Sequence, residues 1–100
     1  MIPLRIHRAA ETEFWEAVAY YEEKIPGLGL DFIEEIERSF EVIRSDPSRW
    51  RIRDHDARRY NIDRFPYYIA YLDFPDHLWV VAIAHGRRLP EYWTERFDQE

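Results

Sequence analysis

The sequence predicts an α+β fold in which an antiparallel pair of helices packs on one face of a small, mostly antiparallel sheet. Two observations predict it. Segments with helical periodicity precede most of the segments with strand periodicity, so helices and strands are largely separated along the chain. The connector between the two helices is short, which favours a helical hairpin. The expected order is strand, helix, helix, strand, strand, strand.

The first strand is expected at residues 4–8, where apolar and polar residues alternate. The first helix is expected over residues 9–24. It should stop at Ile25-Pro26-Gly27, because a residue before proline resists helical geometry. Its apolar face consists of Ala10, Phe14, Ala17, Val18, Tyr21 and Ile25.

The second helix is expected over residues 30–44, ending at Ser45-Asp46-Pro47. Asp31 and Glu34 have the spacing of a capping box, which places the start of this helix close to Leu30. Its apolar stripe consists of Phe32, Ile33, Ile36, Phe40 and Ile43.

Residues 46–57 show no clear period and are expected to form an arginine-rich loop, with Trp50 against the core. Three strands should follow, at residues 58–62, 67–73 and 78–84. The last is apolar on both faces, so it should lie inside the sheet. In the middle one, Tyr67, Ile69 and Tyr71 should share one face and Tyr68, Ala70 and Leu72 the other.

The length of 100 residues predicts one domain spanning 1–100. The chain has no cysteine, which excludes disulfides and thiolate metal sites. Its histidines at positions 7, 55 and 77 lack metal-ligand spacing, so no metal or other cofactor is expected. Without a long apolar run or a signal-peptide core, we expect a cytoplasmic protein that does not contact a membrane.

The charges are unevenly distributed. The net charge is −6, from 14 lysines and arginines and 20 acidic residues. Residues 9–41 hold ten acids and two bases, whereas residues 49–64 hold six arginines and three aspartates. We therefore expect one acidic surface and one locally basic surface. The overall acid excess weakens non-specific attraction to polyanions.

The chemistry-bearing residues gather where the last strand ends. The strand stops at His85-Gly86, and Arg87 and Arg88 follow directly. Beyond Pro90 come Tyr92, Trp93 and Arg96. A rigid strand that delivers such side chains into a loop is a common way to build a site.

An ordered set of segments resembles the RelE/ParE superfamily of toxins from bacterial type II toxin–antitoxin (plasmid-stabilisation) modules, with the ParE side favoured. The resemblance covers nearly the whole chain. It implies the fold order given above and a cognate antitoxin as partner. The segments are Ala10-Glu11, Tyr20-Tyr21-Glu22, Pro26-Gly27-Leu28-Gly29, Phe32 to Pro47, Arg58-Arg59, Phe65-Pro66-Tyr67-Tyr68-Ile69-Ala70-Tyr71 and His85-Gly86-Arg87-Arg88-Leu89-Pro90-Glu91-Tyr92-Trp93.

Some members of this superfamily cut messenger RNA on the ribosome without a metal, and others poison DNA gyrase. For a nuclease, His85 would act as general acid or base, Arg88 and Arg59 would hold the phosphate, and Tyr92 would stack on a base or donate a proton. Further candidates for binding nucleic acid or a target are Arg64, Arg87, Trp93 and Arg96. In the alternative interpretation these residues are structural. His85 would then cap the strand, Arg88 would pair with an acid, and Tyr92 and Trp93 would pack in the core.

Two features favour protein binding over cleavage. Nucleases of this superfamily are typically basic and use lysines around the site, whereas Lys24 is the single lysine here and the net charge is negative. The leading hypothesis is a ParE-like toxin that binds a protein such as gyrase. The alternatives are a ribosome-dependent endonuclease of messenger RNA and a non-toxic binding module. A homodimer or a toxin–antitoxin hetero-oligomer is compatible with all three.

Overall fold

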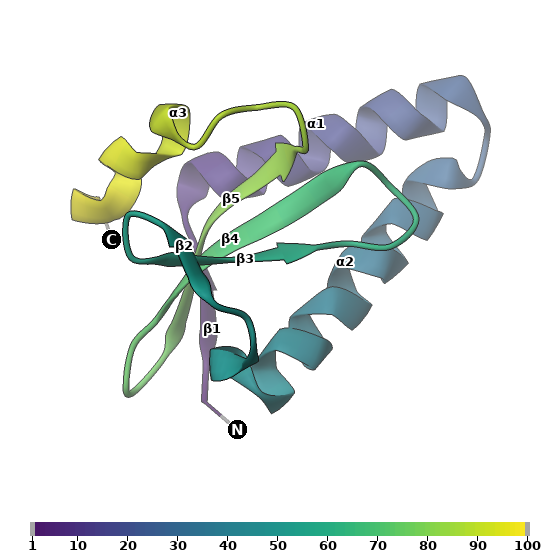
Figure 1. Cartoon of the computed structure of the whole chain (residues 1–100). Coiled ribbons are helices and arrows are strands. Elements are labelled where there is room, and N and C mark those ends of the chain that lie inside the picture. Colours follow the sequence, from purple (N-terminus) through teal and green to yellow (C-terminus); the bar gives the residue numbers. More distant parts are fainter. Residues whose placement is uncertain (1, 100) are drawn as a thin grey trace.

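The computed structural model describes residues 2–99, the side chain of residue 54 excepted, and has two helices packed on a five-stranded sheet (Figure 1). The strand order is β1-β5-β4-β3-β2, in which β1 runs parallel to β5 and the other neighbours are antiparallel. The elements are β1 (Leu4–Ile6), α1 (Arg8–Lys24), α2 (Leu28–Ser45), the 3₁₀ turn η1 (Pro47–Arg49), β2 (Ile52–Asp54), β3 (Ala57–Asn61), β4 (Tyr67–Asp73), β5 (Leu78–His85), α3 (Glu91–Thr94) and the 3₁₀ turn η2 (Glu95–Asp98).

The predicted fold class is confirmed, and β5 lies inside the sheet between β1 and β4, as its apolar faces predict. The expectation of a loop over residues 46–57 is wrong, because β2 forms there. A strand of three residues is too short to show a period. The turn after it has positive φ at both His55 (52°) and Asp56 (77°), the geometry that joins two strands in a tight hairpin.

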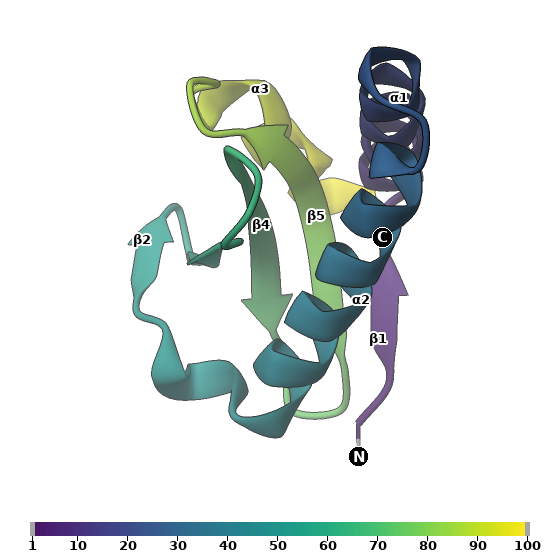
Figure 2. The ribbon, with the colours of Figure 1, turned by 90° about the vertical axis from the view of Figure 1, so that its right-hand side faces the viewer.

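Both helices cover the same face of the sheet (Figure 2). The predicted alternation along β4 is confirmed, since Ile69 and Tyr71 pack under the helices and Tyr68, Ala70 and Leu72 pack on the other face. Ile25 is a correction: it follows the last turn of α1 and is 59% exposed. The core under the helices is built from Ala10, Ala17, Phe32, Ile36, Ile43, Ile62, Phe65, Ile69, Tyr71, Leu78, Val80 and Ile83, with Trp50 packed at its border.

The ends of the helices are capped in ways that the sequence did not predict. β1 ends at Ile6, so the first strand is shorter than the expected residues 4–8. His7 follows it and caps α1, because its Nδ1 accepts the backbone N–H of Ala9 at 2.9 Å. The start of α2 is Leu28, and Gly27 precedes it with a φ of 92°, so the expected capping box is wrong. The carboxylate of Glu22 instead accepts the N–H groups of Gly27 and Gly29, each at 3.0 Å.

A bulge in β5 decides which face each later side chain of this strand occupies. Ala70 pairs with Ala82, but the next residue, Tyr71, pairs with Val80. The extra residue shifts the alternation by one, so that Val80 and Ile83 both pack under the helices. His85, two residues beyond Ile83, therefore lies on the helix-covered face.

The C-terminal segment α3–η2 covers part of the opposite face (Figure 2). Trp93 has no exposed surface and packs on Tyr68, Trp79 and Val81 together with the rest of a second apolar cluster. The remaining members of this cluster are Ala57, Ala70, Leu72, Ala82 and Ala84, with Phe74, Tyr92 and Phe97 at its border.

Candidate functional site

The end of β5 opens into a hollow between α1 and the C-terminal segment, with a volume of about 190 Å³. We call it the His85 hollow. Three of the predicted site residues, His85, Arg88 and Tyr92, line it together. The other lining residues are Glu13, Glu16, Ala17 and Tyr20 of α1, Tyr67 of β4, and Ile83 and Ala84 of β5.

His85 is half-buried and held in one orientation. Its Nδ1 accepts the backbone N–H of Arg87 at 3.2 Å, and its ring meets that of Tyr67 edge-on, with 5.5 Å between centroids. A nitrogen that accepts a hydrogen bond carries no proton, so the neutral ring carries its proton on Nε2. The imidazole can therefore donate from Nε2 to a bound partner.

Arg88 and Tyr92 form a cation–π pair on the rim of the hollow. The guanidinium of Arg88 lies 3.8 Å from the centroid of the Tyr92 ring, and Arg88 is exposed. The Tyr92 hydroxyl is buried on the side of the hollow that Glu13 lines. Burial, and then the negative charge of Glu13, raise the pKa of Tyr92, so this phenol stays protonated.

Arg59 is separated from the other predicted catalytic residues by the sheet. It pairs with Ala70, whose side chain is on the face away from the helices, and its guanidinium lies 3.8 Å from the centroid of the Tyr68 ring. Its Nε donates to Asn61 Oδ1 at 3.3 Å. The structure thus brings His85 together with Arg88, and leaves Arg59 on the opposite face.

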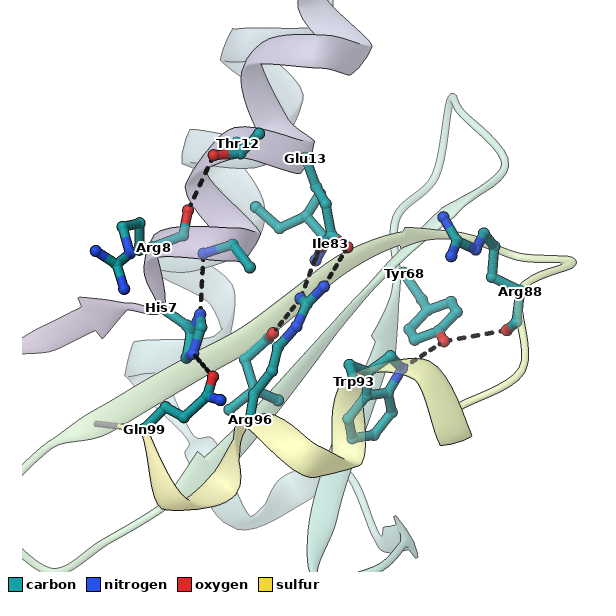
Figure 3. A network of polar contacts seen from close by, with 12 residues as sticks. His7, Arg8, Thr12, Glu13, Tyr68, Ile83, Arg88, Trp93, Arg96 and Gln99 are labelled. Atoms are coloured by element: carbon teal, nitrogen blue, oxygen red, sulfur yellow. Dashed lines mark hydrogen bonds and ion pairs between the residues drawn. The ribbon is translucent and has the colours of Figure 1, made fainter.

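Trp93 and Arg96 hold the C-terminal segment in place (Figure 3). Trp93 Nε1 donates to the Tyr68 hydroxyl at 2.8 Å, and that hydroxyl donates to the Arg88 carbonyl at 3.2 Å. Arg96 donates to Glu13 Oε1 at 3.1 Å, to Glu13 Oε2 at 2.9 Å and to the Val81 carbonyl at 2.8 Å. Trp93 is fully buried and Arg96 is largely buried, so both side chains are engaged in contacts within the molecule.

The two remaining predicted residues are both exposed. Arg64, between β3 and β4, lies 3.4 Å from Asp31 of α2 in an exposed ion pair, away from the His85 hollow. Arg87 lies in the loop after β5, which also carries Leu89, a side chain that is 71% exposed. Among the side chains that the structure describes, no three from His, Asp or Glu come together as a metal site, and none of the described helices is long and apolar enough to cross a membrane.

Comparison with known proteins identifies the family and the fold of this chain. The profile of a family described as the ParE toxin of the type II toxin–antitoxin system parDE matches residues 4–90. The chain belongs to the ParE toxin family. It is therefore the toxin component of a type II toxin–antitoxin module, with a cognate antitoxin as its protein partner.

A solved structure described as the chromosomal ParDE TA system from P. aeruginosa is similar to this ParE-family toxin with a TM-score of 0.75. The match covers 85% of this chain and 96% of that chain at 16% sequence identity, which establishes a shared fold. No curated protein sequence matches significantly.

The residues of α1 that line the His85 hollow were not predicted from the sequence of this ParE toxin. Glu13, Glu16 and Tyr20 are spaced three and four residues apart, so they share one face of α1. That spacing was a usable signal. It does not reveal that this face of α1 meets the end of β5, since that contact depends on tertiary packing.

Proposed function

We propose that this ParE-family toxin arrests growth by binding a protein target, DNA gyrase being the leading candidate, and that its antitoxin relieves the arrest. The observation that carries the proposal is the composition of the His85 hollow. Two carboxylates, Glu13 and Glu16, line it together with His85 and Arg88. Arg59, the second phosphate-binding candidate, lies on the other face of the sheet.

Metal-free cleavage of RNA requires a base, an acid and several cations that converge on one phosphate. The charge of Glu13 is compensated by Arg96 at 2.9 Å. Glu16 is exposed and pairs with no cation among the described residues, so its carboxylate repels a phosphate that approaches Arg88. The hollow is thus poorly suited to hold the transition state of RNA cleavage.

The loop after β5 has the features of a protein-binding surface. Leu89 is 71% exposed and stands between the exposed Arg88 and the half-buried Pro90. An exposed apolar side chain beside arginine and tyrosine matches the composition of residues that dominate binding energy in protein interfaces. We expect Leu89, Arg87 and Arg88 to contact the target.

The test is a supercoiling assay with purified gyrase and relaxed plasmid. The toxin should inhibit supercoiling, and denaturation of the mixture should release broken DNA. A Leu89→Ser variant should lose inhibition by about tenfold or more while its stability stays unchanged, because this side chain contacts solvent. A matched control is Leu30→Ser, which changes an equally apolar side chain that is 59% exposed at the start of α2. Normal gyrase activity at toxin concentrations that arrest growth would refute the gyrase proposal.

A second function remains a defined alternative, because His85, Arg88 and Tyr92 do share one hollow. A ribosome-dependent nuclease would produce new 5′ ends in primer extension on ribosome-bound messenger RNA. A variant with both His85→Ala and Arg88→Ala would then lose cleavage. Harmless overexpression in the absence of antitoxin would instead indicate a binding module without toxicity.

A further inference from the structure

The strand β2 ends the sheet and is flanked by exposed arginines. It pairs with β3 on one side, and among the described residues no strand pairs with its other side. Arg49, Arg51 and Arg53 are all exposed, and none forms an ion pair with a described side chain. We call these three residues the arginine edge. In a chain of net charge −6, three exposed arginines within five residues are a local exception.

The arginine edge is held in place by β3 and β4. Arg58 Nη1 donates to the Trp50 carbonyl at 2.6 Å and to the Ser48 carbonyl at 3.3 Å, while its Nε lies 3.5 Å from Asp73. The Trp50 ring meets the Tyr60 ring edge-on, with 4.9 Å between centroids. A partner that docks here therefore meets a backbone already fixed in an extended conformation, and the entropic cost of ordering this segment is reduced.

Both apolar and basic side chains are exposed along this edge. Ile52 pairs with Arg58 and is 55% exposed. Arg51 precedes β2, and Arg53 lies at a bulge between Ile52 and Asp54 that interrupts the regular alternation of this strand. The face of the sheet away from the helices also carries Arg59, above the ring of Tyr68. An extended segment lying along β2 would meet both the exposed Ile52 and the exposed arginines.

We propose that the arginine edge binds an extended, acidic segment of the cognate antitoxin, which adds a strand next to β2. Backbone hydrogen bonds to the open edge would supply affinity, and carboxylates opposite Arg51 and Arg53 would set the register. This inference rests on the module having an antitoxin and is independent of which target the toxin binds.

The charge distribution selects this edge over the other one. The strand β1 also ends the sheet, but its Ile6 lines an apolar hollow together with Glu11 and Glu37 of the two helices. These two carboxylates offset the exposed Arg5 of β1, so an acidic segment is attracted less strongly there than at β2, where three exposed arginines gather. Residues 9–41 hold ten acids against two bases, so the helical side of the toxin repels such a segment as a whole.

A protein segment fits the edge better than RNA. Recognition of a single strand of RNA uses exposed aromatic rings on which bases stack. The nearby rings are not available, because Trp50 packs against Tyr60 and the buried Tyr68 is covered by Arg59. The exposed Ile52 and the open backbone edge match a peptide, which carries both apolar side chains and hydrogen-bonding backbone groups.

The test measures the affinity of purified toxin for purified antitoxin by calorimetry and surface plasmon resonance. A variant with both Arg51→Glu and Arg53→Glu should bind about tenfold or more weakly, mainly through slower association, and its affinity should depend less on salt. The matched control is Arg5→Glu, an exposed arginine on β1, for which we expect less than about a threefold change. Hydrogen exchange of the toxin–antitoxin complex should show slowed exchange for amides in residues 51–54.

Three outcomes would overturn the proposal. One is unchanged antitoxin affinity in the double variant, with normal circular dichroism. Another is unchanged affinity together with new self-association, which would mean that the arginines only protect an edge strand from pairing. The third is tight binding of a single-stranded RNA oligonucleotide that the double variant loses while its antitoxin affinity stays intact. A toxin that fails to inhibit gyrase but shows the expected loss of antitoxin affinity would refute the gyrase target alone.

Discussion

The Glu13–Arg96 ion pair should be a principal support of the C-terminal segment. It joins α1 to η2, and it also binds β5 twice, since Ile83 N–H donates to Glu13 Oε1 at 3.1 Å and Arg96 donates to the Val81 carbonyl at 2.8 Å. The two side chains are 16% and 13% exposed. Removal of one partner of a fully buried pair costs about 3–5 kcal/mol. Because water reaches part of this pair, we expect Arg96→Met to cost about 2–3 kcal/mol.

Urea unfolding and thermal unfolding measure this loss. A destabilisation of this size corresponds to a decrease in Tm of about 8–24 °C for a domain of this length. A double-mutant cycle with Glu13→Gln isolates the pair itself, and the double variant should be more stable than the sum of the two single effects predicts by about 1–2 kcal/mol. The control is Arg64→Met, which breaks the exposed pair with Asp31 and should cost at most about 1 kcal/mol. If Arg96→Met is no more destabilising than this control, the reasoning is refuted.

Three further predictions concern stability. Trp93→Ala should cost about 3–5 kcal/mol in urea unfolding, because the side chain is fully buried; a loss below about 1 kcal/mol would contradict its place in the core. Gly29→Ala should cost about 1–3 kcal/mol, seen as a lower Tm, because the new Cβ would lie 2.9 Å from the Val18 carbonyl oxygen where the helices meet. Burial raises the pKa of Tyr71 and of Tyr92, so above about pH 10 the unfolded chain loses protons that the folded chain keeps. Stability should then fall with pH by about 1.4 kcal/mol per unit for each tyrosine, and Tyr71→Phe should remove one such contribution from the urea midpoints measured between pH 9 and pH 11.

The sequence predicted the fold where its periodicity was visible. In β4, tyrosines alternate with smaller apolar residues, and the structure places Ile69 and Ala70 on the two predicted faces. The apolar faces of both helices were readable for the same reason. Hence the α+β class, the helical hairpin and the interior position of β5 all follow from local patterns.

The face of His85 was not predictable, because β5 is apolar on both sides. A bulge shifts the phase of a strand by one residue, and such a shift is visible in the sequence only if polar residues mark one face. Residues 78–84 contain no polar marker apart from the indole N–H of Trp79. Without the bulge, His85 would lie on the face of Arg59. One extra residue in the register, which the sequence does not reveal, thus separates Arg59 from His85, Arg88 and Tyr92.

The long-range ion pair between Glu13 and Arg96 was not predictable from the sequence either. Glu13 and Arg96 are 83 residues apart, and the acid-rich segment offers many equivalent partners for Arg96. Which one it meets depends on how α3–η2 packs, and the four residues of each element are too few to show a period. The structural role of Arg96, expected as a candidate for target binding, thus required the packed fold.

The positions of the two proposed surfaces constrain how the antitoxin neutralises the toxin. The target surface follows β5, whereas the arginine edge belongs to β2, three strands further along the sheet. Neighbouring strands lie about 4.8 Å apart, so the two surfaces are separated by roughly 14 Å or more. A segment confined to β2 would leave Leu89 exposed. Neutralisation then requires a second part of the antitoxin that reaches the loop after β5, and a peptide limited to the acidic segment should bind the toxin in calorimetry without relieving gyrase inhibition. Full relief by that peptide alone would show that the two surfaces are coupled or that one of them is misplaced.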